Sequence, residues 1–355
     1  MSKIKSDLMK KVAVRNADYT MKLVPGMKEE GFFDPKAREE IDASVNNNDT
    51  GGFGSNNQNQ SLEEIRAGMG WKKANYAPSH ELTIKNQTFD TTVPARTYVQ
   101  TALKDSSLPT IIFEHGGGFF GGSLNNVEFP CQALADYGAV RVVSVDYGLA
   151  PEHPYPVGLL DSYRVLRWIY ENADSCGVDS KKITVMGDSA GGTLSYNLAT
   201  LDCEFGTNYL NKLVALYPVT YGGKKTELRS RFDSPEGLKA KKDQSLIAQY
   251  IRNFNGSSAS IDDWYIHGAD NENMYLSPLN IPSNVLVNFP KTLFMVGEFD
   301  PLRLQGEAFY QKMKLAGGNI QYIRYNGMVH AFMDKVGDFR QANDALQEAI
   351  QFVLK

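Results

Sequence analysis

The sequence predicts an α/β fold with a mostly parallel, eight-stranded sheet flanked by helices. From about residue 80 onward, short β-rich apolar runs alternate with amphipathic helical patterns. Several of these runs are continuously apolar, as expected for strands that are buried on both faces of a parallel sheet. The predicted strands span residues 81–85, 95–100, 110–114, 140–145, 183–186, 213–216, 292–296 and 320–325.

The first 75 residues do not follow this alternation. Asp34 and Pro35 are typical of a helix start, because proline is tolerated in the first turn. The run Ser-Leu-Glu-Glu at 61–64 has the form of a capping box and predicts a second helix. Between them, residues 46–60 are rich in Asn and Gly and favour a linker. The other interpretation of this segment is a lid loop that carries Phe53.

Within the α/β region, apolar residues recur at helical spacing along 159–170 and 342–353, which predicts helices that pack on the sheet. A polar insertion follows the strand near residue 215. It contains one amphipathic pattern, with Leu246, Tyr250 and Phe254 four residues apart. Ligands bind at the end of the sheet where such an insertion lies. We therefore expect residues 1–75 and 221–275 to form a mainly helical cap on a catalytic domain spanning 76–355.

The composition excludes several classes of protein. A net charge of −4 argues against nucleic acid as the main partner. No apolar run approaches the length of a membrane span, and the first residues lack the apolar stretch of a signal peptide. The scattered cysteines Cys131, Cys176 and Cys203 fit free thiols in a reducing cytoplasm. No Cys/His spacing indicates a zinc site, so no metal is expected.

The run Gly-Asp-Ser-Ala-Gly-Gly at 187–192 follows a predicted strand and precedes a predicted helix. This context is typical of a nucleophile elbow, with Ser189 at a turn too tight for Cβ atoms at Gly187 and Gly191. A strand-to-helix turn exposes the hydroxyl and places helical N–H groups near developing negative charge. Ser189 is thus predicted to be a nucleophile.

A serine nucleophile needs a base, and the base of this arrangement follows the serine in the chain. Of the two later histidines, His267 lies in the polar insertion, whereas His330 follows the last predicted strand. The orienting acid is expected after the preceding strand. Asp300 is favoured there over Glu298, because its turn is where this acid normally lies. A plain helix cap is the structural alternative for Asp300.

The glycine run that begins at His115 predicts an oxyanion hole. It follows a strand and has the form of the HGGG motif, whose N–H groups act together with that of Ala190 after the nucleophile. Gly116, Gly118 and Gly121 also fit a dinucleotide-binding fingerprint. That interpretation leaves Ser189 and His330 without a role and is disfavoured.

With these residues in place, the chain resembles the hormone-sensitive-lipase-like (bacterial family IV) carboxylesterases of the α/β-hydrolase superfamily, over roughly residues 60–355. Five short motifs in the family's order carry the resemblance, at 115–119, 146–152, 187–192, 300–302 and 327–332. The resemblance implies the α/β-hydrolase fold, a cap, and no metal or organic cofactor.

The resemblance also implies roles for individual residues. Ser189, Asp300 and His330 would form the triad, with the N–H groups of Gly117, Gly118 and Ala190 as the oxyanion hole. His115 would brace the glycine loop. Phe119 and Phe120 are expected either to wall the substrate pocket or to be ordinary core residues.

The implied activity is hydrolysis of short-chain carboxylic esters, with a small-molecule ester as the partner. Amide, formamide or lactone hydrolysis would use the same residues. A non-catalytic receptor for a small ligand is disfavoured because His330 is present. Family analogy further suggests a homodimer through an exposed edge at 320–355.

Overall fold

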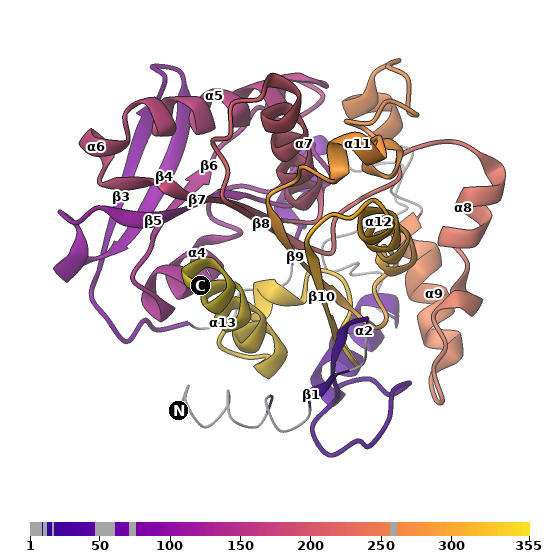
Figure 1. The fold of residues 1–355 in the computed structure, drawn as a ribbon. Helices are drawn as coiled ribbons and strands as arrows, with labels where there is room; N and C mark the ends of the chain where they lie inside the picture. Colours follow the sequence, from indigo (N-terminus) through magenta and orange to yellow (C-terminus); the bar gives the residue numbers. More distant parts are fainter. Residues whose placement is uncertain (1–8, 10–12, 16–17, 47–60, 71–75, 256–260) are drawn as a thin grey trace.

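Ten strands form one sheet in the computed structural model, which describes residues 9, 13–15, 18–46, 61–70, 76–255 and 261–355 (Figure 1). The order across the sheet is β1-β2-β10-β9-β8-β7-β5-β6-β4-β3. The strands are β1 (Ala13–Arg15), β2 (Thr20–Lys22), β3 (Leu82–Phe89), β4 (Val93–Gln100), β5 (Leu108–Glu114), β6 (Arg141–Val145), β7 (Val178–Asp188), β8 (Lys212–Leu216), β9 (Lys291–Gly297) and β10 (Ile320–Tyr325).

The pairing is parallel from β2 through β10, β9, β8, β7 and β5 to β6, and antiparallel at β1, β4 and β3. All eight predicted strands are present, from β3 to β10, which confirms the mostly parallel sheet. Because these strands are parallel, the carboxyl ends of β5, β7, β9 and β10 all lie at the same end of the sheet. Residues that follow these four strands can therefore meet, although they are far apart in sequence.

The predicted count of eight strands is wrong, because β1 and β2 extend the sheet. Each has three residues, too few to show a strand period in the sequence. Strand β2 pairs in parallel with β10, from Thr20 opposite Ile323 to Lys22 opposite Tyr325. The exposed edge expected at β10 is therefore covered by β2, which corrects that expectation, and the homodimer suggested for residues 320–355 stays a prediction.

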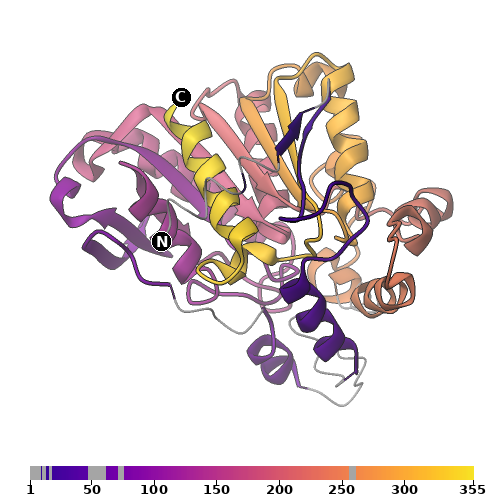
Figure 2. The ribbon, with the colours of Figure 1, turned by 90° about the horizontal axis from the view of Figure 1, so that it is seen from below.

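Helices cover both faces of the sheet. In Figures 1 and 2, α4 and α13 lie on one face, and α5, α7 and α12 pack on the other. The helices are α2 (Pro35–Asn46), α3 (Leu62–Ala67), α4 (Glu128–Tyr137), α5 (Val157–Glu171), α6 (Ala173–Cys176), α7 (Ala190–Phe205), α8 (Thr226–Phe232), α9 (Gln244–Asn255), α11 (Ser283–Leu286), α12 (Arg303–Leu315) and α13 (Arg340–Leu354). Short 3-10 or π turns are η1 (Thr101–Leu103), η2 (Pro235–Gly237), η3 (Ile261–Ile266), η4 (Pro278–Asn280) and η5 (Phe332–Lys335).

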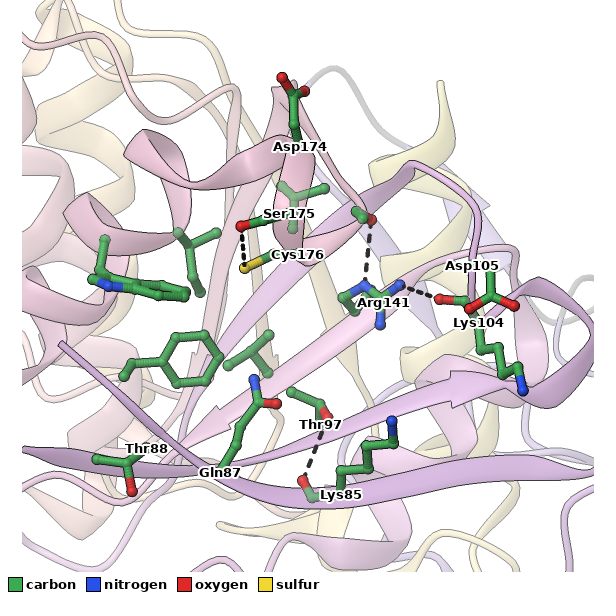
Figure 3. Close-up of a pocket in the computed structure, with 16 residues that line it drawn as sticks. Lys85, Gln87, Thr88, Thr97, Lys104, Asp105, Arg141, Asp174, Ser175 and Cys176 are labelled. Carbon is green, nitrogen blue, oxygen red and sulfur yellow. Dashed lines mark hydrogen bonds between the residues drawn. The ribbon is translucent and has the colours of Figure 1, made fainter. Parts of the chain in front are cut away.

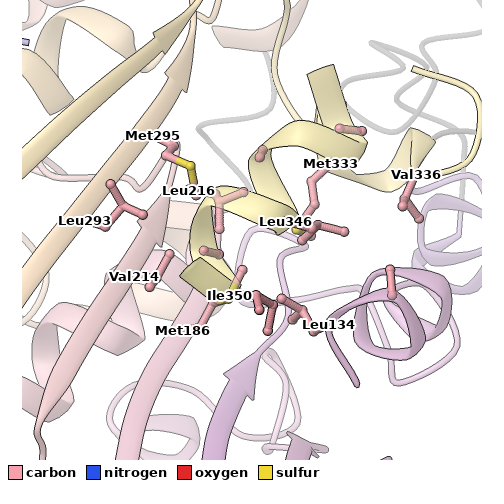
Figure 4. Packing of buried hydrophobic residues seen from close by; sticks show 14 of the residues in the cluster. Leu134, Met186, Val214, Leu216, Leu293, Met295, Met333, Val336, Leu346 and Ile350 are labelled. Atoms are coloured by element: carbon pink, nitrogen blue, oxygen red, sulfur yellow. The ribbon is translucent and has the colours of Figure 1, made fainter. Parts of the chain in front are cut away.

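The apolar faces predicted from helical spacing are those that the fold buries. Leu346 and Ile350 of α13 pack beside Leu134 of α4 and over strand residues such as Val214 (Figure 4). Burial of each such side chain contributes roughly 1.5–3 kcal/mol. These contacts fix the helices on the sheet.

The two predicted helices of the N-terminal segment are present. Asp34 accepts the N–H of Lys36 at 3.0 Å as α2 begins, and Ser61 and Glu64 form the predicted capping box at α3. The linker or lid predicted for 46–60, with Phe53, lies outside the described residues except for Asn46, the last residue of α2.

Helices α2 and α9 pack together although about two hundred residues separate them. Ile41 of α2 and Ile247 and Tyr250 of α9 share one buried cluster with Phe299 and Val329. The latter two residues belong to the loops after β9 and β10. Parts of both predicted cap segments therefore lie against the loops that carry Asp300 and His330.

A polar cavity of about 530 Å³ lies at the amino ends of β6 and β7, beside β3 and β4 (Figure 3). Lys85, Lys104 and Arg141 are among its lining residues, and Arg141 donates to the carbonyl of Lys104 at 2.9 Å. Ser189 follows the carboxyl end of β7, so this cavity is separate from the predicted site.

Candidate active site

Ser189 occupies a sharp turn between the end of β7 at Asp188 and the start of α7 at Ala190. Its backbone has φ 51° and ψ −118°, a conformation that costs an L-residue on the order of 1–3 kcal/mol. A Cβ at Gly187 would collide with the backbone of Gly191, and one at Gly191 with the carbonyl oxygen of Glu114. The two glycines are therefore required sterically, as the sequence predicts.

Ser189, His330 and Asp300 form one chain of hydrogen bonds. Nε2 of His330 lies 2.9 Å from Oγ of Ser189, and Nδ1 lies 2.9 and 3.1 Å from the two carboxylate oxygens of Asp300. Asp300 and His330 are fully buried, and Ser189 is 4% exposed. If Nδ1–H donates to Asp300, Nε2 is left to accept the hydroxyl proton.

The ring of His330 is held on several sides. Tyr217 and Phe254 approach it edge-on, with ring centroids 4.8 and 5.0 Å away. The backbone N–H of His330 donates to the hydroxyl of Tyr250 at 3.2 Å. Tyr250 and Phe254 come from α9, in the insertion. The helical pattern of α9 was readable from the sequence, but its contact with His330 was not.

The two candidate acids have different partners. Asp300 faces His330, whereas the carboxylate of Glu298 accepts the N–H groups of Gly31 at 2.7 Å and Gly327 at 2.9 Å. Asp300 also accepts the backbone N–H of Leu302 at 2.8 Å. Leu302 itself is the N-cap of α12, and no side chain caps that helix, so the alternative of a plain helix cap at Asp300 is wrong. The other late histidine, His267, is exposed in the insertion.

The glycine loop after β5 has a left-handed backbone at three successive residues. Gly117, Gly118 and Phe119 have φ values of 127°, 62° and 68°. Gly121 donates to the carbonyl of Gly117 at 2.9 Å, and a Cβ on Gly117 would collide with the carbonyl of Gly121. The loop therefore needs glycine at this position.

The glycine loop is attached to the nucleophile turn. The N–H of Gly116 donates to the carboxylate of Asp188 at 2.9 Å, one residue before Ser189. Within the described part of the chain, no main-chain hydrogen bond outside the regular elements uses the N–H of Gly117, Gly118 or Ala190. Ala190 is the first residue of α7, where helical N–H groups have no partner within the helix.

His115 braces this loop from inside the protein. Its Nδ1 lies 2.8 Å from the carbonyl of Gly116, and its ring stacks on Tyr147 at 4.4 Å. The hydroxyl of Tyr147 donates to the carbonyl of His115 at 2.6 Å. Burial lowers the pKa of His115, which favours a neutral ring. These contacts agree with a structural role.

Phe119 and Phe120 pack against the insertion. Phe119 stacks on Tyr265 with ring centroids 4.0 Å apart, and Phe120 meets Trp264 edge-on at 5.1 Å. Both phenylalanines are at least nine-tenths buried. They therefore anchor the glycine loop to the insertion, and their role as walls of a substrate pocket stays a prediction.

Glu114, the last residue of β5, is a buried acid beside the site and has no cationic partner among the residues that the structure describes. Burial raises its pKa to about 8, and the hydroxyl of Ser162 donates to it at 2.8 Å. Burial therefore favours the protonated form of Glu114 at neutral pH. Over the described residues, no group of three His, Cys, Asp or Glu side chains is arranged to hold a metal ion. No helix in the described ranges has the length and apolarity that crossing a membrane requires.

Comparison with known proteins gives the same architecture. The model of an α/β-hydrolase-fold family matches residues 111–334. Carboxylesterase NlhH of Mycobacterium tuberculosis is 33% identical over 261 residues, which are 72% of this chain and 76% of the relative. An ethyl acetate hydrolase of Pseudomonas putida is 29% identical over 263 residues, covering 73% and 77% of the two chains.

A solved structure extends the match to most of the chain. The hyperthermophilic esterase of the archaeon Pyrobaculum calidifontis superposes with a TM-score of 0.70 at 26% identity, over 91% of this chain and 98% of the esterase. The family model spans the glycine loop, Ser189, Asp300 and His330. The chain therefore belongs to the α/β-hydrolase superfamily, in its hormone-sensitive-lipase-like family.

Proposed function

We propose that this protein is a serine carboxylesterase that hydrolyses short-chain carboxylic esters through an acyl-enzyme intermediate. The observation that carries the proposal is the buried hydrogen-bond chain from Ser189 through His330 to Asp300. The relatives named carboxylesterase and ethyl acetate hydrolase support ester hydrolysis, and the second supports a small acyl group.

Acylation begins when Nε2 of His330 accepts the proton of Ser189 as its Oγ attacks the ester carbonyl. Asp300 holds the Nδ1–H tautomer and stabilises the imidazolium that forms, without taking the proton. The carbonyl oxygen becomes an oxyanion, which the N–H groups of Gly117, Gly118 and Ala190 bind. Collapse of this intermediate breaks the ester C–O bond, and His330 returns the proton to the leaving alcohol.

Deacylation repeats these steps with water as the nucleophile. His330 takes a proton from the water as it attacks the acyl-serine, and the same N–H groups bind the second oxyanion. Collapse releases the carboxylic acid and restores the hydroxyl of Ser189. No step needs a metal or an organic cofactor, because proton transfer and oxyanion binding are supplied by the chain.

The proposed cap consists of residues from the N-terminal segment (1–75) and the insertion (221–275) over a catalytic domain that spans residues 76–355. The contacts of α9 with His330 and of Phe119 and Phe120 with the insertion support this organisation. Strands β1 and β2 are an exception, since they extend the sheet. The three free cysteines support a reducing, cytoplasmic location.

The test compares wild type with Ser189→Ala on p-nitrophenyl esters of increasing acyl length. We expect hydrolysis to be fastest for the shortest chains and to fall by several orders of magnitude in the variant. Ser195→Ala is a matched control, because Ser195 is a buried serine of α7 whose hydroxyl donates to the carbonyl of Gly191 at 2.9 Å. Equal activity in wild type and Ser189→Ala would exclude the serine mechanism.

A parallel panel with the matching anilide and a lactone distinguishes the bond that is cleaved. Faster turnover of the anilide or the lactone than of the ester would identify the protein as an amide or lactone hydrolase, with Ser189 still the nucleophile. A fluorophosphonate probe is expected to label wild type and to spare Ser189→Ala. Absence of labelling in wild type would favour a ligand receptor.

A further inference from the structure

Glu298 is a buried carboxylate that the proposed mechanism does not use. It follows the last residue of β9 and precedes Asp300 by two positions. The side chain is 2% exposed. Oε1 accepts the N–H of Gly31 at 2.7 Å, and Oε2 accepts the N–H of Gly327 at 2.9 Å. One carboxylate thus joins the N-terminal segment to the loop that carries His330.

Gly327 lies at the start of that loop, three residues before His330. Both its N–H and its carbonyl are hydrogen-bonded. Its N–H donates to Glu298, and its carbonyl accepts the N–H of Asp34 at 3.1 Å. Its φ is 75°, and an added Cβ would collide with Val24 and the backbone of Asp34. The N-terminal segment therefore lies tightly against the loop at the residue that Glu298 binds.

Gly31 extends the connection to the insertion. Its N–H donates to Glu298, and its carbonyl accepts the N–H of Lys241 at 2.9 Å. Its φ is 95°, and an added Cβ would lie 2.9 Å from Cγ of Lys241. A continuous path thus runs from the insertion at Lys241, through Gly31 and Glu298, to Gly327.

Backbone hydrogen bonds also join the loops after β9 and β10 directly. Glu298 donates its N–H to the carbonyl of Tyr325, and Phe299 donates to that of Met328, each at 2.9 Å. Phe299 also packs on Phe33 of the N-terminal segment, with ring centroids 4.5 Å apart. The acid loop, the histidine loop and the N-terminal segment meet at Glu298.

We infer that Glu298 is a positioning residue, whose two oxygens hold the His330 loop in register with Asp300 and couple that loop to the N-terminal segment and the insertion. The inference rests on the proposed function of His330 and Asp300. A carboxylate suits this position because both partners are N–H donors. An amide has one acceptor oxygen, so its NH₂ would face a donor and leave a buried N–H unpaired.

The test is Glu298→Gln, assayed for kcat and KM on a short p-nitrophenyl ester and for the rate of fluorophosphonate labelling. A displacement of the base by a fraction of an ångström to about 1 Å predicts a loss in kcat of roughly tenfold to hundredfold. KM is expected to stay within about twofold, because Glu298 does not touch the serine turn or the glycine loop. The labelling rate should fall in parallel with kcat.

Asp202→Asn is the matched control. Asp202 is also a buried carboxylate that accepts backbone N–H groups, those of Tyr209 at 2.8 Å and Leu210 at 3.1 Å, but it lies near the end of α7 far from Ser189. This variant is expected to lose thermal stability and to keep kcat within about twofold. An equal loss of kcat in Asp202→Asn and Glu298→Gln would overturn the positioning role, as would an unchanged kcat in Glu298→Gln.

Should Glu298→Gln fail to fold, Gly31→Ala tests the same connection with the carboxylate intact. The added Cβ crowds Lys241 and disfavours the left-handed backbone, which displaces the N–H donor. A fall in kcat at constant KM supports the inference, and unchanged kinetics reject it. Ser189→Ala runs alongside: activity in that variant would refute the proposed function, whereas its inactivity with a normal Glu298→Gln would refute the positioning role alone.

Discussion

Replacement of Asp300 by Asn changes the tautomer of His330 without changing the size of the side chain. The backbone decides how the amide is oriented, because Oδ1 of Asp300 accepts the N–H of Leu302 at 2.8 Å. The amide oxygen of Asn keeps that bond, so its NH₂ takes the place of Oδ2, 2.9 Å from Nδ1 of His330. A donor at this position requires Nδ1 to accept, which moves the ring proton to Nε2.

The loss of activity follows from the contact between Nε2 of His330 and Oγ of Ser189. With a proton on Nε2, the ring cannot accept the hydroxyl proton across the 2.9 Å bond to Oγ. The negative charge that stabilises the imidazolium is lost as well. We expect kcat to fall by about 10⁴, or roughly 5 kcal/mol in activation free energy, with KM little changed.

Steady-state hydrolysis of a short p-nitrophenyl ester measures this loss, and circular dichroism with a thermal melt checks that the variant is folded. Asp202→Asn provides the same chemical change at a buried site remote from Ser189. A folded Asp300→Asn enzyme with activity within tenfold of wild type would refute the assignment of Asp300 as the orienting acid.

Two further predictions concern the glycine loop and the buried acid beside it. Gly117→Ala introduces a Cβ that collides with the carbonyl of Gly121 and displaces an oxyanion donor, so kcat should fall by about 10²–10³ in a kinetic assay. Burial raises the pKa of Glu114 from 4.5 to about 8, so the folded state keeps a proton that the unfolded chain loses above its ordinary pKa. The protonated Glu114 therefore stabilises the fold fully below about pH 4.5, and this stabilisation is lost as the pH rises to about 8. In urea titrations, the free energy of unfolding of wild type should fall over this range by about a few kcal/mol more than that of Glu114→Gln.

Each of these two predictions has an experimental outcome that would contradict it. A Gly117→Ala protein with normal turnover would show that the N–H of Gly117 does not stabilise the oxyanion. For Glu114, the decisive comparison is the slope of unfolding free energy against pH. Equal slopes in wild type and Glu114→Gln would mean that the buried carboxyl titrates as it does in the unfolded chain.

Much of the fold is readable from the sequence because its signals are local. Continuous apolar runs such as 183–186 and 292–296 indicate strands buried on both faces, and both lie in strands of the sheet. The helical spacing of Leu346 and Ile350 marks the face of α13 that the structure buries. Strands β1 and β2 were missed because three residues show no period and their pairing depends on β10, some three hundred residues away.

The sequence by itself determined the turn at Ser189, since a Cβ on Gly187 would collide with the backbone of Gly191, four residues along the chain. It also limited the acid to Asp300 or Glu298 and favoured Asp300. Only the tertiary structure decided which carboxylate faces His330 and what the other one binds. Two residues along a loop can point to different partners, and their partners come from the loop after β10 and from the N-terminal segment. Such contacts arise from the packing of distant segments, which no local pattern in the chain records.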